Sequence, residues 1–573
     1  MALFAVEWLS VDIVTLLMLA ALVALGVLTP EEAFLGFANE VIVILASVFI
    51  LSGALARAGV MGWPGALVHR LAGRSEGLLV GLLMTVAASV SAFFSNTSAT
   101  ALLMPTSYQL AKRAKLVPSR LLMPLAYGSI LGGTCTVIGT STNIAGSGFI
   151  TRFGLEPFSL FEFSAVGVVI ATAGVLYMAI VGHRLVPRRG SDSMTGDYQV
   201  RAFLSELMIE EGSQAIGKRL SELQLEGEDV LPLMLIRAKG HLAAARFRTL
   251  LAGDKIVVKA SKEALLRLKD RRDFGIEADK TLGDKDLTIE GTGVSEAVVM
   301  PQSTLIDRTL KQLRFDDRFG AVVLAIYRRG QAYPAQIENM PLRVGDVLLL
   351  QGSQEAFERL RSNSELWGLY DIDSGVISKR KGFYVLSALV GAVALSFFGL
   401  LPLSIAFLLA CLAVVLTRCI SMEEAYRMVE WRLIVLIGGM TGFGVAMQKT
   451  GAAEYLSELI VAWTMPLGVT AVLVAFAALT VILTQPMSNA AAALVVLPIA
   501  LNTAEALSIN PRSMAVLVTL AASLSFITPL EPSSLLVYGP GKYNFRDFLI
   551  CGLPLTLIVL VLLVVMVPIL WPL

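Results

Sequence analysis

Two polar clusters stand in otherwise apolar sequence, and their residue types and spacing point to ion binding. The first comprises Ser91, Ser95, Asn96, Thr97, Ser98 and Thr100, and the glycine-rich segment GTCTVIGTSTN follows at 133–143. The second comprises Thr484, Ser488 and Asn489, followed by Thr528, Pro529, Pro532, Ser533 and Ser534. Hydroxyl and amide oxygens, with backbone carbonyls released beside glycine, are the hard neutral ligands that a small alkali cation requires. The clusters therefore predict two cation sites.

The absence of basic side chains around the two clusters bears on the charge of a bound substrate. No Lys, Arg or His occurs between Ser75 and Ala111, between Leu121 and Thr151, between Thr450 and Pro511, or between Ser513 and Gly541. An anion bound there would be balanced by co-bound cations and by helix N-termini, which suit oxyanions. An uncharged hydrophilic substrate would also suit such a lining, so polarity alone leaves both classes open.

The composition places these clusters in a membrane. Of 573 residues, 55% are hydrophobic and 16% are charged, and the mean hydropathy is +0.72. Roughly two-thirds of the charges lie between Arg184 and Lys381, so two apolar blocks in the lipid bilayer flank one soluble block. A net charge of +1 without a basic tract argues against a nucleic-acid partner. The four cysteines form no CxxC pair, so neither disulfides nor zinc are expected.

Apolar segments of about 20 residues, enough to cross the bilayer, predict the membrane helices. They lie at 11–28, 38–57, 121–149, 163–185, 383–400, 403–418, 431–449, 512–538 and 547–571. Two further stretches, 78–111 and 466–503, are each interrupted by a Ser-Asn pair and are expected to form helical hairpins. The backbone at the tip of such a hairpin needs partners from protein or from a water-filled site.

The two apolar blocks repeat each other. Thr29–Ala33 matches Ser421–Ala425 at an offset of 392 residues, and Ser95-Asn96 matches Ser488-Asn489 one residue further on. Basic residues border the first hairpin and the soluble block and should be cytoplasmic, whereas the ends of the second hairpin should face outward. The blocks 1–190 and 379–573 are therefore predicted to be inverted repeats, with one hairpin entering from each side.

The soluble block contains two copies of one α/β unit, at 191–280 and 281–378. In each copy a Gly-Asp turn, Gly253-Asp254 or Gly345-Asp346, precedes an apolar strand. No GxGxxG motif follows a strand in this block, so a dinucleotide-binding fold is not indicated.

The motifs resemble a known transporter family. SNT at Ser95–Thr97, GTSTN at Gly139–Asn143 and the second Ser488-Asn489 pair resemble the divalent anion:sodium symporter family of the ion transporter superfamily. The soluble pair resembles the TrkA-C (RCK-C) regulatory domains of a bacterial and algal branch often linked to sulfate uptake. This resemblance implies an α-helical polytopic membrane protein with a re-entrant hairpin and a broken helix in each repeat. It also implies a homodimer whose transport domain moves as an elevator against a fixed scaffold.

The resemblance also implies residue roles. One sodium ion would lie near Ser91, Ser95, Asn96, Asn143 and the Gly139 carbonyl, and a second near Thr484, Ser488, Asn489, Glu531 and Pro532. The substrate oxyanion would lie between the two hairpin tips, near Ser95, Asn96, Thr97, Thr140, Ser141, Ser488, Asn489 and Ser533. The second motif has Ala490 where dicarboxylate carriers usually have threonine, which favours a smaller or differently held anion such as sulfate. No cofactor and no metal other than sodium is expected.

Glu531 departs from the family pattern, because the position before Pro532 is usually uncharged. Carboxylates within a membrane are costly and often functional. Glu531 could strengthen the second cation site or carry a proton in place of that sodium. In the alternative, purely structural role, the carboxylate is hydrogen-bonded to a broken helix or exposed to an aqueous cavity.

The leading hypothesis is sodium-coupled uptake of sulfate across the inner cell membrane, with cytoplasmic TrkA-C domains that respond to a small-molecule regulator. Within the same class, the alternative is a carrier of C4-dicarboxylates or related anions. A different class is an ion channel regulated by the RCK-like domains, but a channel needs a filter such as TVGYG, which the sequence lacks. No combination of nucleophile, base and metal ligands indicates an enzyme.

Overall fold

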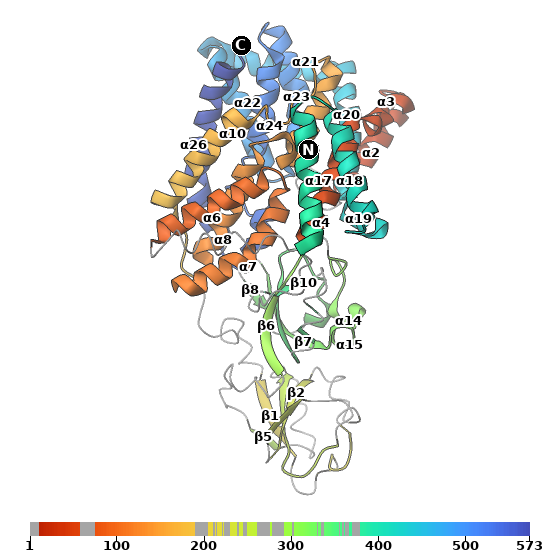
Figure 1. Ribbon diagram of the computed structural model, residues 1–573, viewed down its shortest axis with the longest axis vertical. Helices are drawn as coiled ribbons and strands as arrows, with labels where there is room; N and C mark the ends of the chain where they lie inside the picture. Colours follow the sequence, from red (N-terminus) through yellow and green to blue (C-terminus); the bar gives the residue numbers. More distant parts are fainter. Residues whose placement is uncertain are drawn as a thin grey trace. The chain divides into compact units, whose positions relative to one another are not determined.

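The computed structural model describes most of the apolar blocks and the strands of the inserted block (Figure 1). The described residues are 11–57, 75–189, 204–209, 213, 215–219, 222, 230–237, 240–243, 249–260, 275–277, 292–300, 303–328, 331–333, 337–353, 356–357, 360, 366–368 and 379–573. The chain divides into two compact units. The helical unit comprises Met1–Arg188, Val376–Val537 and Asn544–Leu573, and the sheet unit comprises Arg189–Gly375 and Tyr538–Tyr543.

The helical unit is built from apolar helices, as the composition predicts. In chain order they are α2 (Val11–Ala24), α3 (Pro30–Phe34), α4 (Glu40–Arg57), α6 (Glu76–Ser91), α7 (Asn96–Ala114), α8 (Ser119–Gly133), α9 (Ser141–Ile150), α10 (Ser164–Tyr177), α11 (His183–Leu185), α17 (Lys379–Phe397), α18 (Leu403–Leu416), α19 (Met422–Met428), α20 (Trp431–Lys449), α21 (Ala452–Thr464), α22 (Val469–Thr484), α23 (Asn489–Ala506), α24 (Pro511–Ala522), α25 (Pro532–Tyr538) and α26 (Phe545–Leu570). Among the described residues, four helices are long and apolar enough to cross a membrane: Ser164–Leu185, Trp431–Lys449, Asn489–Ala506 and Phe545–Leu570. The chain is a multi-pass membrane protein.

Helices break at the places where the polar clusters lie. The breaks fall at 92–95 between α6 and α7, at 134–140 between α8 and α9, at 485–488 between α22 and α23, and at 523–531 between α24 and α25. Each expected hairpin, 78–111 and 466–503, is therefore a pair of helices. The expected spans omit α21, because Glu454 and Glu458 interrupt its apolar sequence and lie on the exposed side of an amphipathic helix.

Equivalent segments of the two halves have the same local structure. Thr29 and Ser421 each begin a short helix, α3 or α19, with a capping box completed by Glu32 or Glu424. The halves also exchange equivalent helices, because α2 packs on α20 while α18 packs on α4. These features agree with the internal repeat, and the inverted relation of its two copies stays a prediction.

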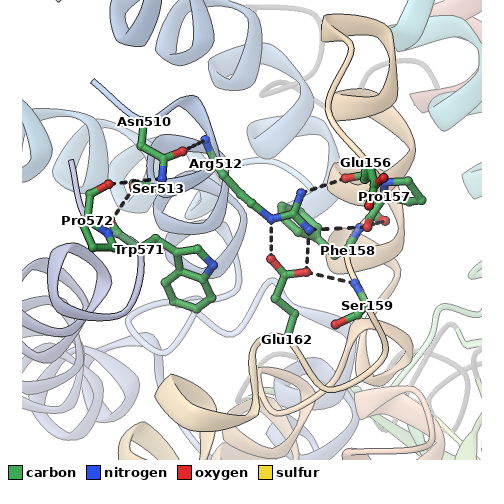
Figure 2. Close-up of polar contacts among 11 residues, drawn as sticks. Glu156, Pro157, Phe158, Ser159, Glu162, Asn510, Arg512, Ser513, Trp571 and Pro572 are labelled. Carbon is green, nitrogen blue, oxygen red and sulfur yellow. Dashed lines mark hydrogen bonds and ion pairs between the residues drawn. The ribbon is translucent and has the colours of Figure 1, made fainter. Parts of the chain in front are cut away.

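Arg512, the second residue of α24, anchors that helix to the start of α10 (Figure 2). Its Nε and Nη2 donate to the two carboxylate oxygens of Glu162 at 2.6 and 2.7 Å, and Nη1 donates to the Glu156 carbonyl at 3.0 Å. The guanidinium also stands over the Phe158 ring, 5.3 Å from its centroid. The neighbouring bonds to the end of α26 run from Asn510 Nδ2 to the Pro572 carbonyl and from Ser513 Oγ to the Trp571 carbonyl.

Arg120, the second residue of α8, anchors its helix to the other end of the same span. Its guanidinium donates to Glu76, the first residue of α6, and to the Val186 carbonyl, which directly follows α11. Glu162 lies two residues before α10. The helices α8 and α24 therefore begin at opposite ends of the apolar Ser164–Leu185 helix.

The helices that begin at these two ends converge on one region. Tyr127, halfway along α8, donates its hydroxyl to the Phe526 carbonyl just beyond α24 at 2.9 Å. Two threonine hydroxyls close the breaks: Thr136 donates to the Ala92 carbonyl, and Thr484 donates to the Ala522 carbonyl at 2.7 Å. Figure 1 shows α6 to α8 in one half of the helical unit and α22 to α24 in the other. The four breaks therefore gather between the two sets of helices.

The sheet unit contains two five-stranded antiparallel sheets. Their strands are β1 (Leu204–Met208), β2 (Val230–Arg237), β3 (Gly240–Ala243), β4 (Lys255–Ala260) and β5 (Gly275–Glu277), then β6 (Thr292–Val299), β7 (Ala321–Arg328), β8 (Gln331–Tyr333), β9 (Val347–Ser353) and β10 (Leu366–Gly368). The orders β3-β2-β4-β1-β5 and β8-β7-β9-β6-β10 are equivalent. In each sheet an arginine at the end of one strand forms a bidentate pair with the aspartate of the Gly-Asp turn, as Arg237–Asp254 and Arg328–Asp346. The duplication is visible in this pattern, while the TrkA-C identity and the boundaries 191–280 and 281–378 stay predictions.

Replacing Arg512 by glutamine should destabilise the helical unit. Arg512→Gln leaves Glu162, whose side chain is 11% exposed, without its bidentate partner, and we expect a loss of roughly 2 kcal/mol. The matched control is Arg427→Gln, which removes an i,i+4 pair with Glu423 whose side chains are 72% and 76% exposed and should cost less than about 0.5 kcal/mol. Thermal unfolding of the purified proteins measures both, and equal melting temperatures would contradict the anchoring role.

Candidate functional site

The first hairpin tip brings together three of the residues expected at a sodium ion. The Ser91 hydroxyl at the end of α6 donates to Asn96 Oδ1 at the start of α7, at 3.0 Å. Gly133 at the end of α8 faces the same amide, because a Cβ at this position would overlap Asn96 Oδ1. A Cβ on Gly139 would lie 3.1 Å from the Ser91 carbonyl oxygen, so this residue also packs against the tip. Both glycines permit an approach that a side chain would block.

Asn143 holds the break between α8 and α9. Its Nδ2 donates to the carbonyls of Gly133 and Thr136, each at 2.9 Å. The side chain is fully buried, and its Oδ1 has no hydrogen-bond partner among the described residues. Hydrogen bonds hold this amide in place through its nitrogen, so its oxygen can bind a cation or a water molecule.

The second hairpin tip reproduces the contact of the first. The Thr484 hydroxyl at the end of α22 donates to Asn489 Oδ1 at the start of α23, at 2.7 Å. As at the first tip, the donor precedes the asparagine by five residues. Asn489 Nδ2 then donates to Ser525 Oγ at 3.2 Å. Ser488 caps α23 by accepting from the Ala491 N–H at 3.3 Å. A hydroxyl therefore orients the asparagine amide at both tips.

Gln485 belongs to this site although the sequence analysis did not single it out. Its side-chain Nε2 donates to the Leu524 carbonyl at 3.1 Å, and its backbone carbonyl accepts from the Thr528 hydroxyl at 3.1 Å. Gln485 thus joins the second tip to the break after α24, as Thr136 does in the first half. In the sequence, only its position directly after Thr484 could have indicated that Gln485 belongs to the site.

Glu531 has a different neighbourhood from the one expected. Its Oε2 accepts from the N–H groups of Ser533 at 2.8 Å and Ser534 at 3.1 Å, and from the Ser533 hydroxyl. The carboxylate also interacts with the side chain of Asn96, a residue of the first hairpin tip. Glu531 is 8% exposed, whereas the adjacent Pro532 is exposed. The carboxylate therefore connects the break after α24 with the first tip rather than with the Asn489 amide.

The residues expected to contact the substrate differ in accessibility. Ser95, Thr97, Ser141, Ser488 and Asn489 are partly exposed, whereas Asn96, Thr140 and Ser533 are buried. Ser95 shares a hydrogen bond of 2.8 Å with Ser98, and the Thr140 hydroxyl caps α9 by accepting from the Thr142 N–H at 3.4 Å. Ser533 is fully buried against Glu531, so its hydroxyl is already engaged.

The site's polar groups are mainly neutral. Across the described part of the chain, no group of three or more His, Cys, Asp or Glu side chains could hold a transition metal. The starts of α7, α9 and α23 lie at the breaks and contribute partial positive charge there. Neutral oxygens beside helix starts can hold alkali cations and an oxyanion together.

Comparison with known proteins gives a consistent picture. The family model described as citrate transporter matches residues 1–521. An uncharacterized transporter of Synechocystis is 33% identical over 97% of this chain and 93% of its own length. An uncharacterized transporter of Escherichia coli is 30% identical over 100% of this chain and 97% of its own length. Sodium/sulfate cotransporter 1 of Chlamydomonas reinhardtii is 23% identical over 62% of this chain and 42% of its own length.

Removing the Tyr127 hydroxyl should loosen the segment that carries Ser525 and Glu531. Tyr127→Phe keeps the ring contact with Phe526, whose centroid lies 5.4 Å away, but deprives a buried carbonyl of its donor. We expect a loss of about 1 kcal/mol. Tyr384→Phe, at a position that is 45% exposed, is the matched control and should leave the melting temperature unchanged. Indistinguishable melting of the two variants would argue against this connection.

Proposed function

We propose that this chain, which belongs to the citrate transporter family within the divalent anion:sodium symporter superfamily, takes up sulfate together with sodium ions. The family match confirms the resemblance predicted from the SNT and GTSTN motifs. The observation that carries the proposal is the equivalent pair of contacts, Ser91 to Asn96 and Thr484 to Asn489, at the two hairpin tips.

Sodium coupling is supported by the oxygens gathered at each tip. In the first half these are Ser91, Asn96 and the Gly139 segment, and in the second half Thr484 and Asn489. All are neutral, and the breaks next to them leave backbone carbonyls free to replace the hydration shell of a small cation. Two such sites would bring the positive charge that these neutral oxygens need in order to hold a dianion beside them.

The choice of sulfate as the substrate is supported by the name of one relative and by the identity of one residue in this chain. The printed name of the Chlamydomonas relative is a sodium/sulfate cotransporter. Ala490 removes a hydroxyl from the second tip, which suits an anion smaller than a dicarboxylate. The family description names citrate, so citrate and succinate are the competing substrates in any test.

Alternating access by an elevator motion is supported by the anchoring of the helices. Arg120 and Arg512 attach α8 and α24 to the two ends of the Ser164–Leu185 helix, so these elements form one body around the breaks. Helices α2, α4, α18 and α20 pack among themselves and would form the fixed scaffold. The scaffold would dimerise, and the sheet unit would act in the cytoplasm as a regulatory TrkA-C pair.

The deciding experiment is uptake by the purified protein in proteoliposomes. Labelled sulfate, succinate and citrate are supplied in turn, with and without an inward sodium gradient. Sulfate uptake that requires the gradient supports the proposal. Gradient-dependent uptake of citrate or succinate alone would instead support the carboxylate alternative.

Removal of either tip asparagine should impair coupled uptake. Asn96→Ala and Asn489→Ala each delete one amide oxygen, and loss of a single ligand of about 1.4 kcal/mol lowers affinity roughly tenfold. We expect the sodium concentration that gives half-maximal uptake to rise by at least that factor. Asn502→Ala is the control, because among the described residues this amide bonds only to the Pro498 carbonyl within α23. Unaltered sodium dependence in both tip variants would refute the proposed sites.

A methyl group at Gly133 should have the same effect without touching a polar atom. Gly133→Ala would push the Asn96 amide out of place, because the new Cβ overlaps Asn96 Oδ1. We expect sodium-driven uptake to fall by roughly tenfold while the protein remains folded. In the control Gly391→Ala, the new Cβ meets nothing within 4 Å and uptake should be normal. Uptake assays with melting curves compare the two, and normal uptake by Gly133→Ala would show that the close approach is unimportant.

A further inference from the structure

We propose that the Gly345-Asp346 turn of the second sheet restrains transport by holding the connecting segment, Tyr538–Tyr543, which lies between α25 and α26. This inference rests on the proposed function, because it concerns how movement of the same site is regulated. It names the residues through which the sheet unit would act on that movement.

The connecting segment follows directly on the serines of the candidate site. Ser533 and Ser534 lie in the first turn of α25, whose last residue, Tyr538, is the first residue of the segment. Helix α25 has seven residues, so the two serines precede the segment by only about 6 to 8 Å along the helix axis. A displacement of the segment is therefore expected to move both serines.

The connecting segment is a compact turn that closes α25. The Tyr543 N–H donates to the Tyr538 carbonyl at 3.1 Å, and the Lys542 N–H donates to the Gly539 carbonyl at 2.9 Å. Lys542 has a left-handed backbone, with φ +52°. These are the two hydrogen bonds and the left-handed residue of a Schellman motif. The segment is thus fixed to the end of α25, and whatever holds the segment also holds that helix.

The sheet unit touches this turn at two points. Residues Tyr538–Tyr543 belong to the sheet unit, although the chain on either side of them belongs to the helical unit. A Cβ at Gly539 would lie 2.5 Å from the Gly345 carbonyl oxygen, so the two backbones are in direct contact. Such an approach requires glycine at 539. The second point is Arg189, whose Nη1 donates to the Lys542 carbonyl at 3.2 Å.

The Gly345-Asp346 turn is itself fixed within the second sheet. Gly345 has φ +78°, and its N–H donates to the Val299 carbonyl of β6 at 3.0 Å. Both carboxylate oxygens of Asp346 accept from Arg328 of β7, and Oδ2 also accepts from the Arg343 N–H at 2.8 Å. The Asp346 carboxylate therefore determines where the Gly345 carbonyl lies.

The first sheet offers an internal comparison. Asp254 pairs with Arg237 and accepts from the Leu251 N–H at 2.9 Å, as its counterpart does in the second sheet. Gly253 is nevertheless exposed, and a Cβ there would meet nothing within 4 Å among the described residues, whereas Gly345 is buried. The turn forms without an outside partner, so the contact with the connecting segment is an added feature of the second copy.

The course of the chain makes this contact a restraint. Before the sheet unit the chain leaves α10 and α11, which belong to the body that Arg120 and Arg512 hold around the breaks. After the sheet unit it enters α17, which packs on α18 and α4 of the proposed scaffold. The sheet unit is thus joined covalently to both bodies, and its hold on the connecting segment opposes movement of one against the other. Release of the segment should speed transport.

Asp346→Asn tests the restraint, and Asp254→Asn is the matched control. Each substitution removes the charge of an aspartate that pairs with arginine in the same kind of turn, so the two should reduce stability similarly. In Asp346→Asn alone, we expect sodium-driven sulfate uptake by the full-length protein in proteoliposomes to be roughly fivefold faster. The amides of residues 532–543 should also exchange with deuterium roughly fivefold faster in this variant.

Gly539→Ala is a second test, which remains available if Asp346→Asn does not fold. The new Cβ overlaps the Gly345 carbonyl oxygen and must push the turn away from the segment. We expect the same acceleration of uptake and of amide exchange. The control is Gly391→Ala, whose Cβ meets nothing within 4 Å among the described residues and which should behave like the wild type.

The outcomes separate a restraint from a supporting contact. Equal effects of Asp346→Asn and Asp254→Asn on uptake would overturn the proposal, and so would slower uptake by folded Gly539→Ala. Unchanged exchange of residues 532–543 in both test variants would show that the turn does not hold the segment. If the wild type transports citrate or succinate instead of sulfate, the proposed substrate is wrong and the same comparison is made with that anion. If it transports none of the three, the proposed function fails, and amide exchange alone decides whether the turn holds the segment.

Discussion

A backbone that breaks its helix in apolar surroundings must find hydrogen-bond partners for the freed groups, and this requirement organises the helical unit. Side chains from neighbouring breaks supply those partners. Thr136 closes the break after α6, Thr484 closes the break after α24, and Asn143 satisfies two carbonyls at the break after α8. Because the four breaks depend on one another, they must lie together. The polar groups that form hydrogen bonds with the freed backbone at the breaks are then the same groups that can bind ions.

Two arginines fix the helices that lead to the breaks. Helices α8 and α24 begin at opposite ends of the Ser164–Leu185 helix, where Arg120 and Arg512 hold backbone carbonyls and carboxylates. Each helix is shorter than a full span, so each ends before it reaches the opposite side. Because the two helices start at opposite ends and are both short, α8 meets the segment beyond α24, where the Tyr127 hydroxyl donates to the Phe526 carbonyl.

Much of this arrangement could be predicted from the sequence, and the rest depends on contacts between distant residues. The Ser-Asn pairs, the glycine-rich segment and the nearly constant offset between the halves predict the breaks and the tip residues, since each can be recognised without knowing which distant residues are in contact. The sequence placed Glu531 at the second cation site, because Glu531 adjoins Pro532 in the chain. Its contact with Asn96 spans more than 400 residues and depends on how α7 meets the segment after α24. The anchoring by Arg120 and Arg512 was equally hidden, because single arginines at helix starts are ordinary in any membrane protein.

The two halves share a backbone plan but not a charge, and this difference makes the two hairpin tips chemically unequal. Both tips orient an asparagine amide through a hydroxyl five residues earlier. The second amide faces a serine hydroxyl, whereas the first faces the Glu531 carboxylate. A hydroxyl can both donate and accept a hydrogen bond, whereas an ionised carboxylate can only accept one. The two amides therefore meet different chemistry, although the fold that presents them is duplicated.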